Sequence, residues 1–102
     1  MLLYKNITAD ETQVLLSKGS NMGNIKSMTI TNNLSLATDF KLFLRDVYTG
    51  GNPEYNIVNT RIPMKTTLYL DQSIVQFNSK KFEMKYTTLT SGGTTDMDII
   101  IK

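Results

Sequence analysis

The chain has 102 residues, which suffices for one domain but not for two separate hydrophobic cores. It contains neither His nor Cys, so the usual general base near neutral pH, the thiol nucleophile, the commonest transition-metal ligands and disulfide bonds are all excluded. The net charge is only +2 and the basic residues are scattered, which argues against a phosphate-binding surface and therefore against nucleic acid as a partner.

Residues that favour β structure fill the segments between three glycine clusters, Gly19/Gly23, Gly50/Gly51 and Gly92/Gly93. Glycine suits turns that need a positive φ and weakens the interior of a strand, so this distribution predicts a small all-β domain. Period-two alternation of apolar residues then predicts strands over the ranges Leu3–Thr8, Thr12–Ser17, Ile25–Thr31, Thr38–Val47, Tyr55–Ile62, Lys65–Asp71, Lys81–Leu89 and Thr95–Lys102.

The strand Thr38–Val47 alternates most clearly. Its core-facing side chains should be Phe40, Leu42 and Leu44, because they occupy every second position. Lys41, Phe43 and Arg45 then point outward. The pattern therefore predicts that Phe43 is a large apolar group on an exposed, otherwise charged face.

The segment Asp71–Phe77 fits no strand pattern. It could be a turn that carries Ile74 and Phe77 into the core, or it could hold a single turn of helix. With about eight strands at roughly 8–12-residue spacing, the chain predicts a single antiparallel β-sandwich over residues 1–102, jelly-roll-like in its connections. A closed barrel is the alternative, and a short N-terminal arm over about residues 1–6 is expected in either case.

Paired carboxylates are the remaining option for chemistry. Asp96 and Asp98 are two residues apart in a strand, so both point to one side. They could form half of a calcium site or a glycosidase pair, or they could mark the solvent face of the last strand. No loop rich in oxygen ligands accompanies them, which favours the solvent face. We expect no metal, no cofactor and no enzymatic activity.

The amino terminus lacks a basic segment followed by an apolar run, so synthesis without a signal peptide is expected. The longest apolar run, Ile99–Ile101, is far too short to span a membrane, and no membrane partner is expected.

Apolar side chains expected at the surface make the best candidates for protein contacts. The N-terminal arm supplies one group, the strand Thr38–Val47 supplies Phe43, and two tyrosines flank the Gly50-Gly51 loop. Those tyrosines could instead form a small sugar platform, or they could simply cap the end of the sandwich. The candidate interface residues are Leu2, Leu3, Tyr4, Phe43, Tyr48 and Tyr55.

From Thr29 onward the chain resembles a group of small β-sandwich proteins of tailed bacteriophages. The resemblance rests on the strand end Thr29–Asn32, the alternating Phe40–Leu44, the step Ile62-Pro63 before an apolar strand, and the final Asp98–Ile101. It implies a virion structural protein of the capsid, neck or tail. Such proteins carry no known chemistry, so no active-site residues transfer.

The expected function is therefore that of a non-enzymatic capsid decoration or cement subunit, which binds and stabilises the assembled shell. The expected location is the virion, the expected partners are the major capsid protein or neck and tail proteins, and self-association into a homo-oligomer is expected. Two alternatives stay open: a neck or tail structural protein, and a carbohydrate-binding module for host-surface glycans.

Overall fold

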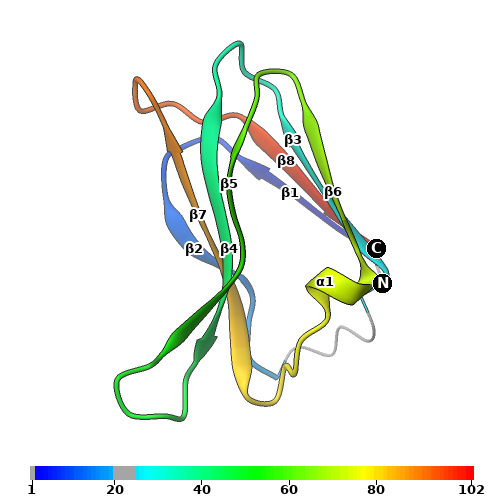
Figure 1. Cartoon of the computed structure of the whole chain (residues 1–102), viewed down its shortest axis with the longest axis vertical. Helices are drawn as coiled ribbons and strands as arrows, with labels where there is room; N and C mark the ends of the chain where they lie inside the picture. Colours follow the sequence, from blue (N-terminus) through cyan, green and yellow to red (C-terminus); the bar gives the residue numbers. More distant parts are fainter. Residues whose placement is uncertain (1, 20–24) are drawn as a thin grey trace.

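The computed structural model describes residues 2–19 and 25–102. Within them the chain forms eight strands and one short helix (Figure 1). Their bounds are β1 Leu3–Ile7, β2 Thr12–Leu16, β3 Ser27–Asn32, β4 Thr38–Asp46, β5 Glu54–Ile62, β6 Thr67–Asp71, α1 Gln72–Val75, β7 Phe82–Thr90 and β8 Met97–Ile101. Each strand begins and ends within two residues of the range predicted from the sequence.

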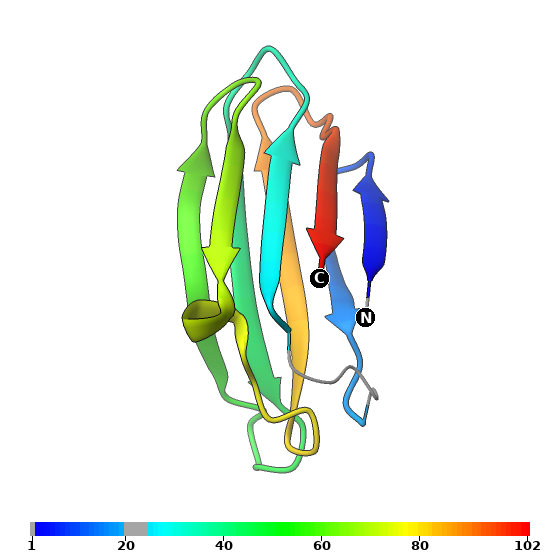
Figure 2. The ribbon, with the colours of Figure 1, turned by 90° about the vertical axis from the view of Figure 1, so that its right-hand side faces the viewer.

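The strands form two four-stranded antiparallel sheets that pack face to face (Figures 1 and 2). Sheet A has the order β1-β8-β3-β6, and sheet B has the order β2-β7-β4-β5. Of the described connections, β4–β5 stays within one sheet, while the others cross between sheets. This order is that of a jelly roll. The predicted all-β sandwich with jelly-roll connections is confirmed, and the two sheets do not close into a barrel.

The core lies between the sheets and is built by the alternation that the sequence displays. Met28 and Ile30 of β3 face Phe40 and Leu42 of β4 from the opposite sheet, and all four are almost completely buried. The apolar side chains that complete this core are Ile7, Leu15, Leu16, Ile25, Ile62, Leu70, Val75, Met84, Tyr86, Met97, Ile99 and Ile101.

The ambiguous segment after β6 contains the short helix α1, which lies at one end of the sandwich (Figure 1). The side chain of Asp71 caps it, accepting a hydrogen bond from the Ser73 backbone N–H at 2.9 Å. Val75 is fully buried and Phe77 packs against the core, whereas Ile74 is exposed. The prediction for Phe77 is confirmed and that for Ile74 is wrong, because the helical turn directs Val75 inward instead.

The expected N-terminal arm is not a free arm. Residues Leu3–Ile7 form the edge strand β1, whose partner along its whole length is β8. Leu3 and Ile7 face the core, so the arm prediction is wrong for this segment. The apolar alternation of Leu3 and Ile7 is the physical reason, since burying both requires pairing with the sheet.

Candidate protein-binding surfaces

The outer face of sheet A carries one row of side chains that crosses all four strands. The strand registers place Tyr4 opposite Ile100, Ile100 opposite Thr29, and Thr29 opposite Tyr69. Tyr4 and Tyr69 are 67% and 62% exposed, and Ile100 is half-buried between them. We call Tyr4, Ile100, Thr29 and Tyr69 the tyrosine row. It combines two large rings that have polar tips with a flat, uncharged centre, a composition typical of protein contacts.

A network of amides and carboxylates holds the neighbouring row in place. Asp98 accepts hydrogen bonds from Asn6 Nδ2 at 2.7 Å and from Asn33 Nδ2 at 2.9 Å. These bonds, that from Asn33 foremost, hold the pKa of Asp98 below its usual value. The same two amides reach Asp96 at 3.4 and 3.3 Å. The cluster thereby ties β1 and the loop after β3 to β8, which fixes the position of Tyr4.

For the acidic pair Asp96 and Asp98, the sequence leaves two interpretations: a calcium site or glycosidase pair, or the solvent face of the last strand. The structure shows both carboxylates engaged by asparagine side chains at the surface of sheet A. Among residues 2–19 and 25–102, no three His, Cys, Asp or Glu side chains gather as they would around a metal ion.

A shallow groove of about 440 Å³ runs along the edge of sheet A between β1 and β8. Tyr4, Asn6, Asp98 and Ile100 line it from the outer face. Lys5, which also lines it, lies opposite Ile99 on the inner side, and its Nζ is 5.8 Å from the centre of the Tyr86 ring. An inward-pointing lysine of this kind protects an edge strand from pairing with another chain.

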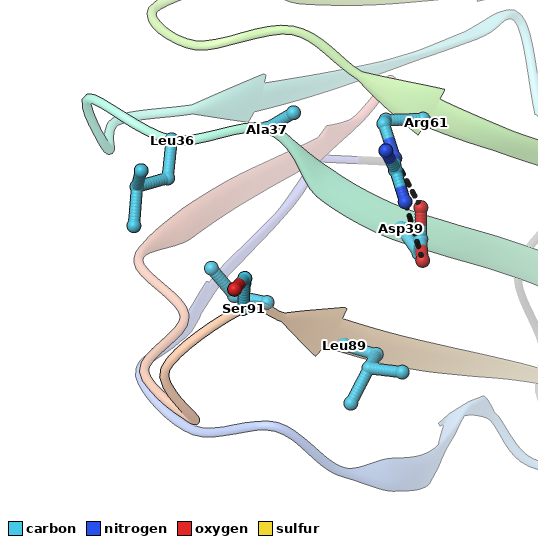
Figure 3. A pocket seen from close by; sticks show the side chains of 7 residues that line it. Leu36, Ala37, Asp39, Arg61, Leu89 and Ser91 are labelled. Carbon is cyan, nitrogen blue, oxygen red and sulfur yellow. Dashed lines mark hydrogen bonds and ion pairs between the residues drawn. The ribbon is translucent and has the colours of Figure 1, made fainter.

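A second hollow, of about 400 Å³, lies in sheet B, where β4 begins and β5 and β7 end (Figure 3). The exposed side chains of Leu36 and Leu89 line it. Arg61 and Asp39 also line it, and Arg61 Nε donates a hydrogen bond to Asp39 Oδ1 at 2.8 Å. This hydrogen bond lowers the pKa of Asp39 and raises that of Arg61. None of these residues is among the contact residues predicted from the sequence. The alternation of β7 could have identified Leu89, which shares its side with Lys85 and Thr87.

The prediction that Phe43 is exposed is wrong. Phe43 does point away from the core cluster, but only 2% of it is accessible. The ammonium groups of Lys41 and Lys85 lie 4.5 and 5.9 Å from the centre of its ring, so their long side chains cover it. Phe43 is therefore buried on the outer face of sheet B and offers no ring to a partner in this conformation.

The two tyrosines that flank the glycine loop are both exposed, but they have different neighbours. Lys18 Nζ lies 3.9 Å from the centre of the Tyr48 ring, whereas Tyr55 meets Phe82 edge-on at 5.9 Å. Each ring is thus engaged separately at this end of the sandwich. The structure gives no contact that would join them into one sugar-stacking platform.

Buried Asp46 holds the loop between them. Its carboxylate accepts hydrogen bonds from the Tyr48 and Thr49 backbone N–H groups at 2.9 and 3.1 Å, and from the Thr49 hydroxyl at 2.6 Å. The hydroxyl bond is the main cause that lowers the pKa of Asp46. These bonds therefore hold the backbone at Tyr48 in place.

The remaining predicted contact residues, Leu2 and Leu3, lie where β1 begins. Leu2 is exposed next to β1, while Leu3 is half-buried and packs against the core. Of the six candidates, Leu2 and Tyr4 thus lie close together at β1 of sheet A, and Tyr48 and Tyr55 lie at the β4–β5 connection of sheet B. Leu3 and Phe43 are not available as contact residues, because Leu3 packs against the core and Phe43 is buried.

No helix in the described part of the chain has the length and apolarity needed to cross a membrane. Comparison of the chain with protein-family models, curated proteins and solved structures finds no match.

Proposed function

We propose that the chain is a non-enzymatic structural subunit of a bacteriophage virion, and that it binds other proteins of the particle through the outer face of sheet A. The tyrosine row is the observation that carries the proposal. It presents Tyr4 and Tyr69 on a face whose centre has no charge to desolvate. Burying such rings favours association while their hydroxyls can still find hydrogen-bond partners.

Two further considerations support a place in the virion. The jelly roll is a fold that viral capsid proteins use, although it also serves lectins and cupins. The sequence pattern also resembles that of small phage β-sandwich proteins. Because His and Cys are absent from the sequence, adhesion is a better fit to its chemistry than catalysis.

Capsid decoration is the position that we favour. A subunit that binds only the assembled shell stabilises it by mass action, and many weak contacts across a lattice add avidity. A neck or tail position uses the same kind of contact at fewer sites. Copy number separates the two, since a decoration subunit should match the major shell protein in abundance.

The test is quantitative mass spectrometry of purified particles of the phage that encodes the chain. Recovery in amounts comparable with the major shell protein would support decoration, and a small number that matches the symmetry of the tail axis would support a neck or tail position. Complete absence from intact particles would overturn the proposal.

A further inference from the structure

The edge of sheet B formed by β5 is the longest edge in the described structure. β5 spans nine residues, whereas β1, β2 and β6 span five each. β4 pairs with one side of β5, and no described strand lies on the other side (Figure 2). Residues 55–60 carry no charge and no proline, two of the usual means of protecting an edge. Inward-pointing Lys5 supplies such protection to β1, but no charged side chain of β5 points inward.

The sequence of β5 is chemically self-complementary about its centre. Reading outward from the pair Ile57 and Val58, an amide faces an amide, then an aromatic residue faces a β-branched one, and finally an acid faces a base. The pairs are Ile57 with Val58, Asn56 with Asn59, Tyr55 with Thr60, and Glu54 with Arg61. Two copies of β5 run antiparallel in this register would therefore place opposite charges together at both ends.

A β-bulge makes this register possible. In a regular strand the members of these pairs would point to opposite faces, because their numbers differ in parity. The register of β5 with β4 shifts between Val58, opposite Leu42, and Asn56, opposite Phe43, which leaves Ile57 as the extra residue. The shift places both members of the amide pair and both members of the acid–base pair on the outer face of sheet B. These residues are Glu54, Asn56, Asn59 and Arg61, opposite Arg45, Phe43, Lys41 and Asp39 respectively.

The backbone of the same four residues points to the free edge. The Asp46 N–H donates to the Pro53 carbonyl at 2.9 Å, so this pair is hydrogen-bonded across β4 and β5. Hydrogen-bonded and non-hydrogen-bonded pairs alternate along an antiparallel ladder. The backbone groups of Glu54 and Asn56 therefore point away from β4. Asn59 and Arg61 oppose β4 residues of the same parity and do likewise.

We propose that two copies of this chain associate through β5, antiparallel about a twofold axis, so that their B sheets form one continuous eight-stranded sheet. Glu54 of each copy lies opposite Arg61 of the other, and Asn56 lies opposite Asn59. Glu54 makes no ion pair with any described residue, while Arg61 holds Asp39 mainly through Nε and is well exposed. The guanidinium therefore has donors left for a second carboxylate. Such pairing is isologous and closes at two copies. It does not depend on the proposed place in a virion.

Charge substitutions at the two asparagines test the register. In Asn56→Lys/Asn59→Lys, lysine lies opposite lysine in both central pairs. The dissociation constant of the dimer, measured by sedimentation velocity, should therefore rise at least about tenfold. In Asn56→Lys/Asn59→Glu, lysine lies opposite glutamate, and association should return to near the level of the natural sequence. Thr12→Lys/Val14→Lys places the same added charge on the opposite edge of sheet B and should leave association unchanged. Circular dichroism checks that each variant is folded.

Amide hydrogen exchange provides a second readout that is specific to this edge. Exchange at Glu54, Asn56, Asn59 and Arg61 should slow as the concentration of the natural protein rises, and it should stay fast in the double-lysine variant. A natural protein that remains monomeric at every concentration would overturn the proposal. So would a double-lysine variant that dimerises normally, or concentration-dependent protection at the β1 or β6 edge in place of β5.

Discussion

Tyr4 and Tyr69 lie on one row of sheet A, one on each of its edge strands, with Ile100 and Thr29 between them. Three inter-strand spacings separate their backbones, which corresponds to about 14 Å. A partner that contacts both rings must therefore present a surface as wide as the whole sheet. This requirement fits a flat protein surface better than a peptide strand or a small ligand.

Replacing both rings should remove binding to particles without unfolding the protein. Each substitution, Tyr4→Ser or Tyr69→Ser, should weaken binding about tenfold, because buried interface tyrosines contribute on the order of 1–2 kcal/mol. Stability should change by no more than about 0.5 kcal/mol, since both side chains are exposed in the free protein. Cosedimentation with particles that lack the protein measures the effect.

Tyr48→Ser is the matched control for this experiment, because Tyr48 is similarly exposed but belongs to the β4–β5 loop of sheet B. It should leave binding unchanged if the tyrosine row makes the contact. Loss of binding with Tyr48→Ser alone would contradict that assignment and would support the contact predicted at the glycine loop.

Phe43→Ala should destabilise the protein by about 3 kcal/mol, the usual cost of removing a buried aromatic side chain. Only 2% of Phe43 is accessible, and Lys41 and Lys85 cover its ring. Urea unfolding measures the loss, and Phe43→Leu should recover part of it because an apolar side chain still fills the space. A change below about 0.5 kcal/mol would show that the ring is exposed in solution, as the sequence pattern suggested.

Phe43 also shows where prediction from sequence stops. Alternation correctly places its side chain on the outer face of β4, opposite Lys85 of β7. Alternation cannot tell that two lysines converge over the ring, because they come from positions 41 and 85 and meet only once β4 and β7 pair. Exposure depends on neighbours across the sheet, whereas a single strand reveals only direction.

Strand positions and the sandwich were predictable because each strand carries its own alternating pattern. The tyrosine row was not predictable as a unit. The alternation Leu68-Tyr69-Leu70 directs the Tyr69 side chain away from the core, but its alignment with Tyr4 depends on the register of β8 and β3 between them. The hollow beside Leu36 was missed for a similar reason, since it forms where a loop passes the ends of three strands.

Asn32→Leu should cost about 2–3 kcal/mol, because Asn32 is a fully buried amide that satisfies several backbone groups. Its Nδ2 donates to the carbonyls of Leu36 at 2.8 Å and Ile62 at 3.1 Å, and its Oδ1 accepts from the Leu34 N–H at 3.0 Å. Leucine leaves these groups without their partner, and the bond to the Ile62 carbonyl is buried away from water. The neighbouring Asn33→Ala should cost about 1 kcal/mol, since water can replace its bonds to surface carboxylates. Equal losses in thermal unfolding would contradict this distinction.

The ring of Tyr86 is fully buried, and its hydroxyl donates to Glu11 Oε1 at 2.5 Å. Burial, followed by the hydrogen bond and charge of Glu11, raises the pKa of Tyr86 well above its usual range. In the unfolded chain the pKa of the tyrosine returns to about 10. The stabilisation due to this shift is therefore fully present below about pH 10 and is lost above it, as the unfolded state gives up its proton first.

Lysines lose charge in the same range, so comparison with a variant is needed. Urea unfolding between about pH 8 and pH 11 should show a steeper loss of stability for the natural protein than for Tyr86→Phe. Identical slopes for the two proteins would mean that the Tyr86 hydroxyl ionises as easily in the folded state as in the unfolded one.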